Sequence, residues 1–137
     1  CEILYDTLNQ YPNYKENMVV GTFHDEIEKE LKDKYPELMR GAPTGTAAKF
    51  ILTTFLGANL FDRSDFACLQ IPTSYDIGII LTLDKKVIIN RAHRRNIAVQ
   101  YWTINDAETM RKLIELGCDC IMTDNPELLR SVLEEYK

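Results

Sequence analysis

The chain has 137 residues, enough for one domain with a moderate hydrophobic core. It is 45% hydrophobic and 27% charged, as soluble globular proteins are, and its net charge of −5 argues against a nucleic-acid partner or an anionic membrane surface, because both bind basic faces. No apolar run reaches the roughly 18 residues that a membrane span requires, and no secretion signal is visible at the start.

The first half of the chain predicts helices that alternate with short strands. Apolar residues at helical spacing, apolar runs between polar residues and breaks at proline indicate the elements. These are a helix over 1–11, a strand at 18–23, a helix over 25–35, a strand at 38–42 and a helix over 44–59. Thr44 or Thr46 is expected to cap the last of these helices and Gly57 to end it. Glu28 is expected to face Lys32 one turn on.

The second half predicts strands at 66–72, 97–104 and 118–123, with helices over 84–96, 107–116 and 126–136. Segment 73–83 is left open between a loop and a short irregular element. The helix over 84–96 should turn Val87, Ile88 and Ala92 inward.

Several residues in this half are typical of helix ends. Asn105 or Asp106 should cap the helix over 107–116, with Glu108 completing a capping box with Asn105. Gly117 should end that helix. Asn125 before Pro126 is typical of the start of the last helix, although Asp124 is an alternative cap.

Alternating strands and helices with short connections predict an α/β fold with parallel strands and crossover helices. A closed (β/α)8 barrel needs eight strands and typically about 250 residues, whereas this chain offers five strand candidates. The chain is therefore either a small open α/β sheet or the C-terminal part of a (β/α)8 TIM-type barrel. It begins with Cys1 inside an apparent helix, which indicates a piece of something longer, so 1–137 is interpreted as a single partial domain.

The four cysteines predict reduced core thiols in a cytoplasmic protein. Cys118 and Cys120 alternate on a predicted strand, so their side chains point to opposite faces and cannot easily bridge each other. Their spacing from His24 and His93 does not match a zinc finger.

The stretch IAVQYWTIND at 97–106 raises a functional question, because an apolar strand ends on Trp102 beside polar side chains. One interpretation is a packed strand end that caps the next helix. The other is a working surface at a barrel mouth, since parallel barrels place their sites at C-terminal strand ends. The carboxylates expected at strand ends, Asp25, Asp106 and Asp124, show no convincing convergence, so no tight metal site is expected in this chain.

Three other features have simpler interpretations. His24 is expected to be a loop residue, and 41–45 a strand-to-helix turn that lacks the lysine and spacing of a phosphate-binding loop. The cluster Arg91, His93, Arg94 and Arg95 is expected to be a solvated helix end, where the helix dipole favours cations, and a phosphate or partner contact is the alternative.

The strings VVGTFHDE and NRAHRRNIAVQYWTINDAETMRKLIELGCDCIMTDNPELL resemble the C-terminal half of the glycerophosphodiester phosphodiesterase family. The resemblance runs from about residue 5 to residue 135, and its most specific part is the strand ending WTIN, the helix AETMRKLIELG, then CDCIMTD and NP. The family usually has a small residue where Cys120 stands.

The resemblance implies a barrel that hydrolyses glycerophosphodiesters to glycerol 3-phosphate and an alcohol with a divalent metal, Mg²⁺ or Ca²⁺. It places Phe23 and Trp102 at strand ends that line the substrate. The family's catalytic histidines and metal ligands lie on earlier strand ends, namely His-Arg-Gly, an acidic pair, His-Asp and Glu-x-Lys. None of these strand ends occurs here, and His24-Asp25 matches a later strand, so no catalytic and no metal residue is assigned.

The leading interpretation is therefore a C-terminal phosphodiesterase fragment that supplies scaffold and substrate-lining aromatics and is inactive alone. A missing barrel half would leave sheet edges exposed, so self-association or pairing with an N-terminal half is expected. A catalytically silent half-barrel that binds a phosphorylated small molecule or a protein partner is the alternative. An unrelated small α/β enzyme is a third.

Overall fold

The computed structural model describes residues 1–57 and 65–137. The chain divides into two compact units, 1–68 and 69–137, which are described separately. In the described ranges no helix is long and apolar enough to cross a membrane.

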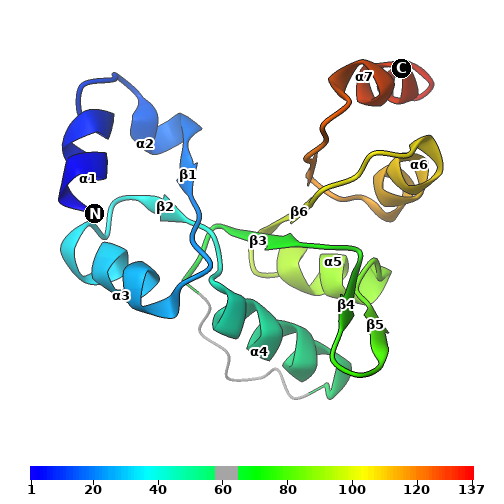
Figure 1. Ribbon diagram of the computed structural model, residues 1–137, viewed down its shortest axis with the longest axis horizontal. Coiled ribbons are helices and arrows are strands. Elements are labelled where there is room, and N and C mark those ends of the chain that lie inside the picture. Colours follow the sequence, from blue (N-terminus) through cyan, green and yellow to red (C-terminus); the bar gives the residue numbers. More distant parts are fainter. Residues whose placement is uncertain (58–64) are drawn as a thin grey trace. The chain divides into compact units, whose positions relative to one another are not determined.

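The first unit is built around a short parallel strand pair (Figure 1). Its elements are α1 (Glu2–Leu8), α2 (Tyr14–Asn17), β1 (Val19–Val20), α3 (Asp25–Lys34), β2 (Met39–Arg40) and α4 (Thr44–Phe55). β1 and β2 pair in parallel, with Val20 opposite Arg40 and α3 as the crossover. Gly41 extends this pairing through a parallel bridge to Cys68. The carboxyl ends of both strands therefore lie on the same edge.

Apolar residues of the helices and of the segments next to them form the core of this unit. Leu8, Tyr14, Leu31 and Leu38 form one buried cluster. Phe50 of α4 packs edge-on against Phe66, with ring centroids 5.9 Å apart. Phe50 and Ile51 of α4 are buried, whereas Phe55, the last residue of that helix, is exposed.

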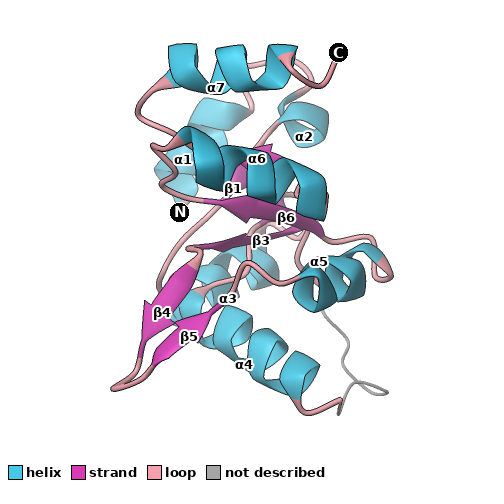
Figure 2. Cartoon of the chain, turned by 90° about the vertical axis from the view of Figure 1, so that its right-hand side faces the viewer, coloured by secondary structure: helices cyan, strands magenta, loops and turns pink. Residues whose placement is uncertain are grey.

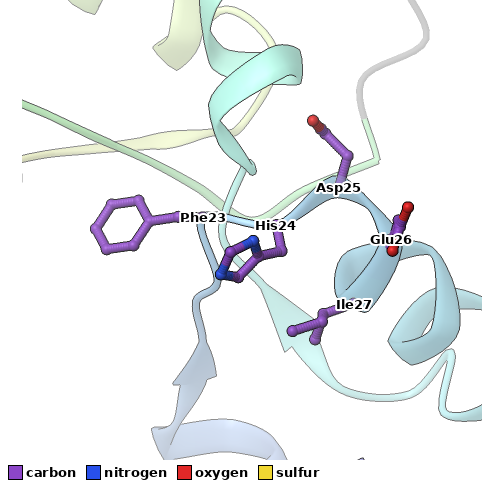
Figure 3. Close-up of a pocket in the computed structure, with 5 residues that line it drawn as sticks. All are labelled: Phe23, His24, Asp25, Glu26 and Ile27. Carbon is purple, nitrogen blue, oxygen red and sulfur yellow. The ribbon is translucent and has the colours of Figure 1, made fainter.

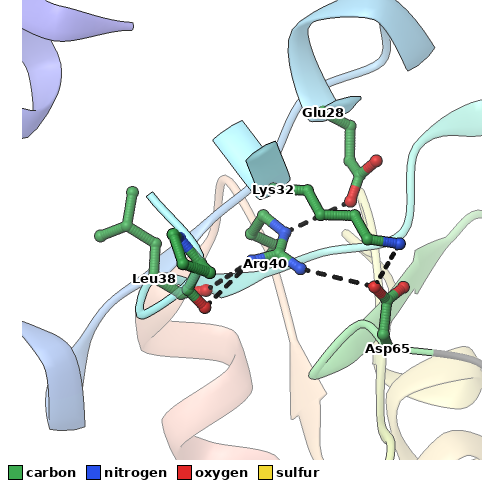
Figure 4. Close-up of polar contacts among 6 residues, drawn as sticks. Glu28, Lys32, Leu38, Arg40 and Asp65 are labelled. Carbon is green, nitrogen blue, oxygen red and sulfur yellow. Dashed lines mark hydrogen bonds and ion pairs between the residues drawn. The ribbon is translucent and has the colours of Figure 1, made fainter. Parts of the chain in front are cut away.

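A buried arginine lies at the centre of the polar contacts in the first unit (Figure 4). The Arg40 side chain is 6% exposed; its Nε lies 3.3 Å from Glu28 Oε1 and its Nη2 3.8 Å from Asp65 Oδ2. Its Nη1 donates to the carbonyls of Pro36 and Leu38. Lys32 lies 2.6 Å from Asp65 and lowers the pKa of that carboxyl. The prediction that Glu28 pairs with Lys32 is therefore wrong, because each of them forms its ion pair with a residue outside α3.

The second unit holds a three-stranded sheet in the order β3-β6-β7 and a separate hairpin. Its elements are β3 (Cys68–Ile71, which starts at the boundary), β4 (Ser74–Asp76), β5 (Ile80–Thr82), α5 (Lys86–His93), β6 (Ala98–Tyr101), α6 (Ala107–Leu116), β7 (Cys120–Ile121) and α7 (Pro126–Glu134). β6 and β7 are parallel, with Tyr101 opposite Ile121. β4 and β5 are antiparallel, with Tyr75 opposite Leu81. Figure 2 shows this hairpin extending away from β3 and β6.

The core of the second unit consists of alternate strand residues and helix faces. Its most deeply buried side chains are Leu69, Ile88, Ile89, Val99, Tyr101, Met110, Leu113 and Val132. The Tyr101 hydroxyl donates to the Leu83 carbonyl at 2.9 Å. Burial is the main cause of the raised pKa of this tyrosine, and the Asp84 carboxylate adds to it. Tyr101 therefore stays a neutral hydrogen-bond donor inside the core.

The α/β class with parallel strands is confirmed, and the predicted helices and strands occur in order, with shorter strands at β1 and β7. Two details of the second unit differ. The open segment 73–83 is the β4–β5 hairpin, and Val87 is 49% exposed rather than inward.

In the first unit, neither Thr44 nor Thr46 caps α4, because Pro43 takes the N-cap position. Gly57 lies just beyond the helix with φ +65°, as expected of a terminating glycine, and positions 58–59 of the predicted helix lie outside the described residues.

The cysteines fit the core prediction only in part. Cys68 is buried in the core, Cys1 and Cys118 are half-buried, and Cys120 is exposed. Burial raises the pKa of Cys118 to about 11. The expectation of core thiols is therefore wrong for Cys120, because β7 is short and its Cys120 side chain meets solvent.

Candidate functional site

The strand-end segment of the first unit starts three residues after β1. Phe23 is 68% exposed and lines a hollow with His24, Asp25, Glu26 and Ile27 (Figure 3). His24 precedes α3, and its backbone N–H donates to Thr22 Oγ1 at 3.1 Å, so it is the loop residue that was expected. The structure thus presents Phe23 as an accessible aromatic ring at the end of β1.

Asp25 lies against the next helix. A Cβ placed on Gly45 would lie 2.8 Å from Asp25 Oδ2, so the carboxylate contacts the first turn of α4. A negative charge is favourable at a helix N-terminus. The turn predicted over 41–45 is shorter in the structure: 41–43 connect β2 to this helix, and positions 44–45 already belong to α4. Asp25 is therefore occupied by packing, and Figure 3 shows it pointing away from the Phe23 ring.

Trp102 lies at the strand-end edge of the second unit. It follows β6, is half-buried, and its backbone N–H donates to the Ile71 carbonyl at the end of β3, 3.2 Å away. The Trp102–Thr103 peptide bond is cis. Phe23 and Trp102 belong to different units, and each ends a strand of its own unit.

The Asn105 side chain joins the loops that follow β6 and β7. Its Oδ1 accepts from the Thr123 hydroxyl at 3.0 Å and from the backbone N–H of Asp124 at 2.9 Å. Its Nδ2 donates to Asp124 Oδ2 at 3.0 Å. The Thr123 hydroxyl in turn accepts from the Asn125 N–H at 3.0 Å. Asn105 is thus a connection between strand ends, a role that its sequence position did not reveal.

The helix caps next to this connection follow the sequence closely. Asp106 caps α6 and accepts from the Thr109 N–H at 2.8 Å, which lowers the pKa of its carboxyl. The capping box from Asn105 to Glu108 is wrong, because the cap is one residue later. Asn125 caps α7 by accepting from Leu128 N–H, so the alternative cap by Asp124 is wrong.

The basic cluster at the end of α5 makes contacts at the N-terminal ends of β6 and β7, opposite the strand ends described above. His93 Nε2 lies 2.8 Å from Asp119 Oδ2, which also accepts from the Val99 N–H. Arg91 is 7% exposed, so the solvated-face interpretation is wrong for this residue, which lies on the inner side of α5. Polar contacts at the N-terminal ends of parallel strands are typical of a role in stability rather than in catalysis.

Another ion pair, with one buried partner, was also not predicted. Lys112, whose side chain is 54% exposed, pairs with Asp84, whose side chain is 7% exposed. Helical spacing could have placed Lys112 on an outer face of α6, but nothing in the sequence indicated that Asp84 is buried.

The acidic side chains at the strand ends are therefore engaged one by one. Asp25 contacts α4, Asp106 caps α6, and Asp124 is bonded by Asn105. Among residues 1–57 and 65–137, no group of three or more His, Cys, Asp or Glu side chains could hold a metal ion. The residues at the described strand ends therefore do not fit Mg²⁺ or Ca²⁺, because these ions require several converging oxygen ligands.

Comparison with known proteins decides the family. The model of the glycerophosphoryl diester phosphodiesterase family matches residues 46–128, more than half of the chain. This chain belongs to that family. The resemblance seen in the sequence is confirmed, and the matched range includes Trp102, whereas Phe23 lies before it.

Individual members of the phosphodiesterase family are also similar to this chain. The chain is 23% identical over 125 residues to "Probable glycerophosphodiester phosphodiesterase 2" of Mycobacterium tuberculosis, covering 88% of this chain and 46% of that protein. Its structure is similar to a glycerophosphodiester phosphodiesterase of Parabacteroides distasonis, with a TM-score of 0.67, 17% identity, and coverage of 98% of this chain and 50% of that one.

A second similar structure is an Oleispira antarctica phosphodiesterase in complex with the product sn-glycerol-3-phosphate. The TM-score is 0.59, the identity 20%, and the coverage 98% of this chain and 52% of that one. The chain thus spans about half the length of these three relatives.

Proposed function

We propose that residues 1–137 are a single partial domain, the C-terminal part of a (β/α)8 phosphodiesterase barrel. The complete enzyme would hydrolyse glycerophosphodiesters to glycerol 3-phosphate and an alcohol. The observation that carries this proposal is coverage: the chain aligns over 98% of its own length with about half of two phosphodiesterase structures. The parallel β-α-β pairs β1–α3–β2 and β6–α6–β7 support it, since barrels are built from this unit.

Within that enzyme, this chain would supply scaffold and substrate-lining aromatics. Phe23 and Trp102 each follow a parallel strand at its carboxyl end, where α/β barrels bind their substrates. An aromatic ring offers apolar area to a glycerol backbone and can pack beside a polar group.

The acid–base groups and the Mg²⁺ or Ca²⁺ ligands would come from outside this chain. The separate engagement of Asp25, Asp106 and Asp124 supports this, because each contacts a different partner and no group of three or more His, Cys, Asp or Glu in the described ranges could hold a metal ion. Metal-assisted attack on a phosphodiester needs several such groups held together. The chain by itself is therefore expected to be inactive.

The partner would be the missing N-terminal half or a second copy of the chain. β7 is an edge strand of its sheet and carries the exposed Cys120. Unpaired strand edges form hydrogen bonds with another chain. Sedimentation at micromolar concentration tests this proposal, and a well-folded monomer would contradict association of the chain alone.

Hydrolysis tests the functional proposal. The purified chain is incubated with glycerophosphocholine and with bis(p-nitrophenyl) phosphate, with Mg²⁺, Mn²⁺ and Ca²⁺ in turn, and no turnover is expected. Expressed within its full reading frame, the chain should show metal-dependent turnover that Trp102→Ala weakens through a higher KM. Asp33→Ala, on the exposed side of α3, is the control. Turnover by the chain alone that survives Trp102→Ala but not Asp124→Ala would refute the proposal.

A further inference from the structure

The backbone on both sides of Trp102 is held by neighbouring strands. Tyr101 ends β6, and its carbonyl accepts from the Met122 N–H at 2.9 Å. The Trp102 N–H donates to the Ile71 carbonyl on β3 at 3.2 Å. On the other side, the Ile104 N–H donates to the Met122 carbonyl at 2.9 Å. The backbone that carries the Trp102 ring is therefore bonded both to β3 and to the chain that continues β7.

The Asn105 side chain adds three hydrogen bonds just beyond this segment. Its Oδ1 accepts from the Thr123 hydroxyl at 3.0 Å and from the Asp124 N–H at 2.9 Å, and its Nδ2 donates to Asp124 Oδ2 at 3.0 Å. Asn105 is exposed, so its amide could form equivalent hydrogen bonds with water. All three bonds nevertheless join one neighbouring loop. This arrangement indicates that the position of the loop, and not the burial of a polar group, requires them.

The Asn105 contacts close the open end of the β6–β7 pair. Regular pairing of β7 ends at Ile121, and the main-chain bond from Ile104 to Met122 follows it. The terminal hydrogen bonds of a strand pair open more readily than those within it. Because the Asn105 bonds come directly after this terminal bond, they keep it closed. Trp102 therefore lies between two points at which its loop is fixed.

We propose that Asn105 is a positioning residue that holds Trp102 in the orientation in which its ring lines the substrate. This inference rests on the proposed function and assigns to Asn105 a part in substrate binding. The orientation of a ring follows the backbone that carries it, because side-chain rotamers are set relative to that backbone. Breaking the bond from Asn105 to Asp124 should therefore change the surroundings of the Trp102 ring and weaken substrate binding, without changing the chemical step.

Asn105→Asp breaks one bond with little change in size. The new carboxylate keeps an acceptor for Thr123 and for the Asp124 N–H, but it places an oxygen where Nδ2 stood, 3.0 Å from Asp124 Oδ2. Two carboxylates at this distance repel each other. Adding Asp124→Asn supplies an amide donor on the other side, so the paired substitution restores the hydrogen bond with donor and acceptor exchanged.

Trp102 emission reports on the ring directly, because Trp102 is the only Trp among the 137 residues. Quenching of this emission by acrylamide in the purified chain should increase by about twofold in Asn105→Asp, as the loop opens to solvent. The paired variant should return to the parent value. Asp124→Asn alone should leave the emission unchanged, since its amide oxygen still accepts from Asn105 Nδ2.

Two further variants serve as controls. Asn125→Asp adds the same charge to the neighbouring loop, and its carboxylate can still cap α7 by accepting from the Leu128 N–H, so emission and KM should match those of the parent. Thr123→Val removes one donor to Asn105 without adding charge, and it should increase quenching in the same direction but by less. Circular dichroism measures whether each variant keeps its helices.

Kinetics in the full reading frame test the link to the substrate. With glycerophosphocholine, Asn105→Asp should raise KM by about tenfold, the factor expected for loss of a hydrogen bond to a charged group, and should change kcat by less than about twofold. The paired variant should recover the parent KM. In a Trp102→Ala background, Asn105→Asp should add less than about twofold to KM, because a residue that acts through another has little effect once that residue is removed.

Three results would overturn this inference. Equal quenching in Asn105→Asp and Asn125→Asp would show that Trp102 keeps its orientation without the Asn105 amide. Failure of the paired variant to recover quenching and KM, although it keeps its helices, would show that the hydrogen bond to position 124 is not the cause. An undiminished KM increase in the Trp102→Ala background would show that Asn105 does not act through Trp102. Absence of hydrolysis by the full-length parent would instead refute the proposed function, and the quenching experiment would still test the positioning of Trp102.

Discussion

Replacing Arg40 with methionine removes a buried guanidinium and keeps most of the side-chain volume. Arg40 is 6% exposed and Glu28 16%, so the substitution leaves the Glu28 carboxylate largely shielded from water without its cation. Breaking a buried ion pair from one side costs about 3–5 kcal/mol, and the long 3.3 Å contact and partial exposure place this case near the lower limit. The carbonyls of Pro36 and Leu38 also lose a donor.

A loss of about 3 kcal/mol corresponds to a decrease of about 1.5 M in the urea midpoint for a typical dependence of about 2 kcal/mol per molar. Circular dichroism during urea unfolding measures this midpoint. Lys34→Met is the matched control in the same unit, since it breaks the exposed pair with Glu30 and should cost under about 1 kcal/mol. Adding Glu28→Gln to Arg40→Met should restore part of the stability, because it removes the uncompensated charge.

The reasoning would be refuted if Arg40→Met cost no more than Lys34→Met. It would also be refuted if Glu28→Gln made the Arg40→Met variant less stable, since the unpaired Glu28 charge would then not be the source of the loss.

Three other predictions follow from single groups. Asn105→Ala removes three hydrogen bonds between exposed loops and should lower the free energy of unfolding by about 1–2 kcal/mol, measured by urea unfolding followed through Trp102 emission. Asp106→Ala should lower the free energy of unfolding by about 1 kcal/mol at neutral pH and by less in acid. The Thr109 N–H lowers the pKa of Asp106 in the folded state, so the stabilisation is present above the ordinary aspartate range and is lost as pH falls through the lowered pKa. An equal cost at all pH values would contradict this prediction. A thiol reagent should label Cys120 fastest, Cys118 slowly because burial raises its pKa to about 11, and buried Cys68 only on unfolding, with peptide mass spectrometry as the readout.

Much of the fold could be predicted because it depends on neighbours in sequence. Helical spacing placed the inward side chains of α5 except Val87, and Gly117 ends α6 with φ +84° as expected. The Asn125-Pro126 start of α7 also depends on adjacent residues alone.

Features that depend on distant residues were less visible. The burial of Arg40 requires Asp65, which is 25 positions away, and the role of Asn105 requires Thr123 and Asp124. The segment 73–83 lacked the Asn-Gly or Asp-Gly pair that indicates a tight hairpin, so its strands went unassigned.

The prediction that Phe23 and Trp102 line the site came from the family resemblance. The position of an aromatic residue at a strand end does not by itself separate a substrate-lining ring from a packed strand end beside a helix cap. The structure adds that Phe23 is an exposed ring and that Trp102 is half-buried.

The Asn105 amide gives the second unit a mechanical property. Because one side chain joins the start of α6 to the start of α7, displacing the loop after β6 without the loop after β7 breaks three hydrogen bonds. A molecule that binds beside Trp102 and moves its loop would transmit that motion to the segment around Thr123. Amide hydrogen exchange in the two loops should therefore slow or speed up in step.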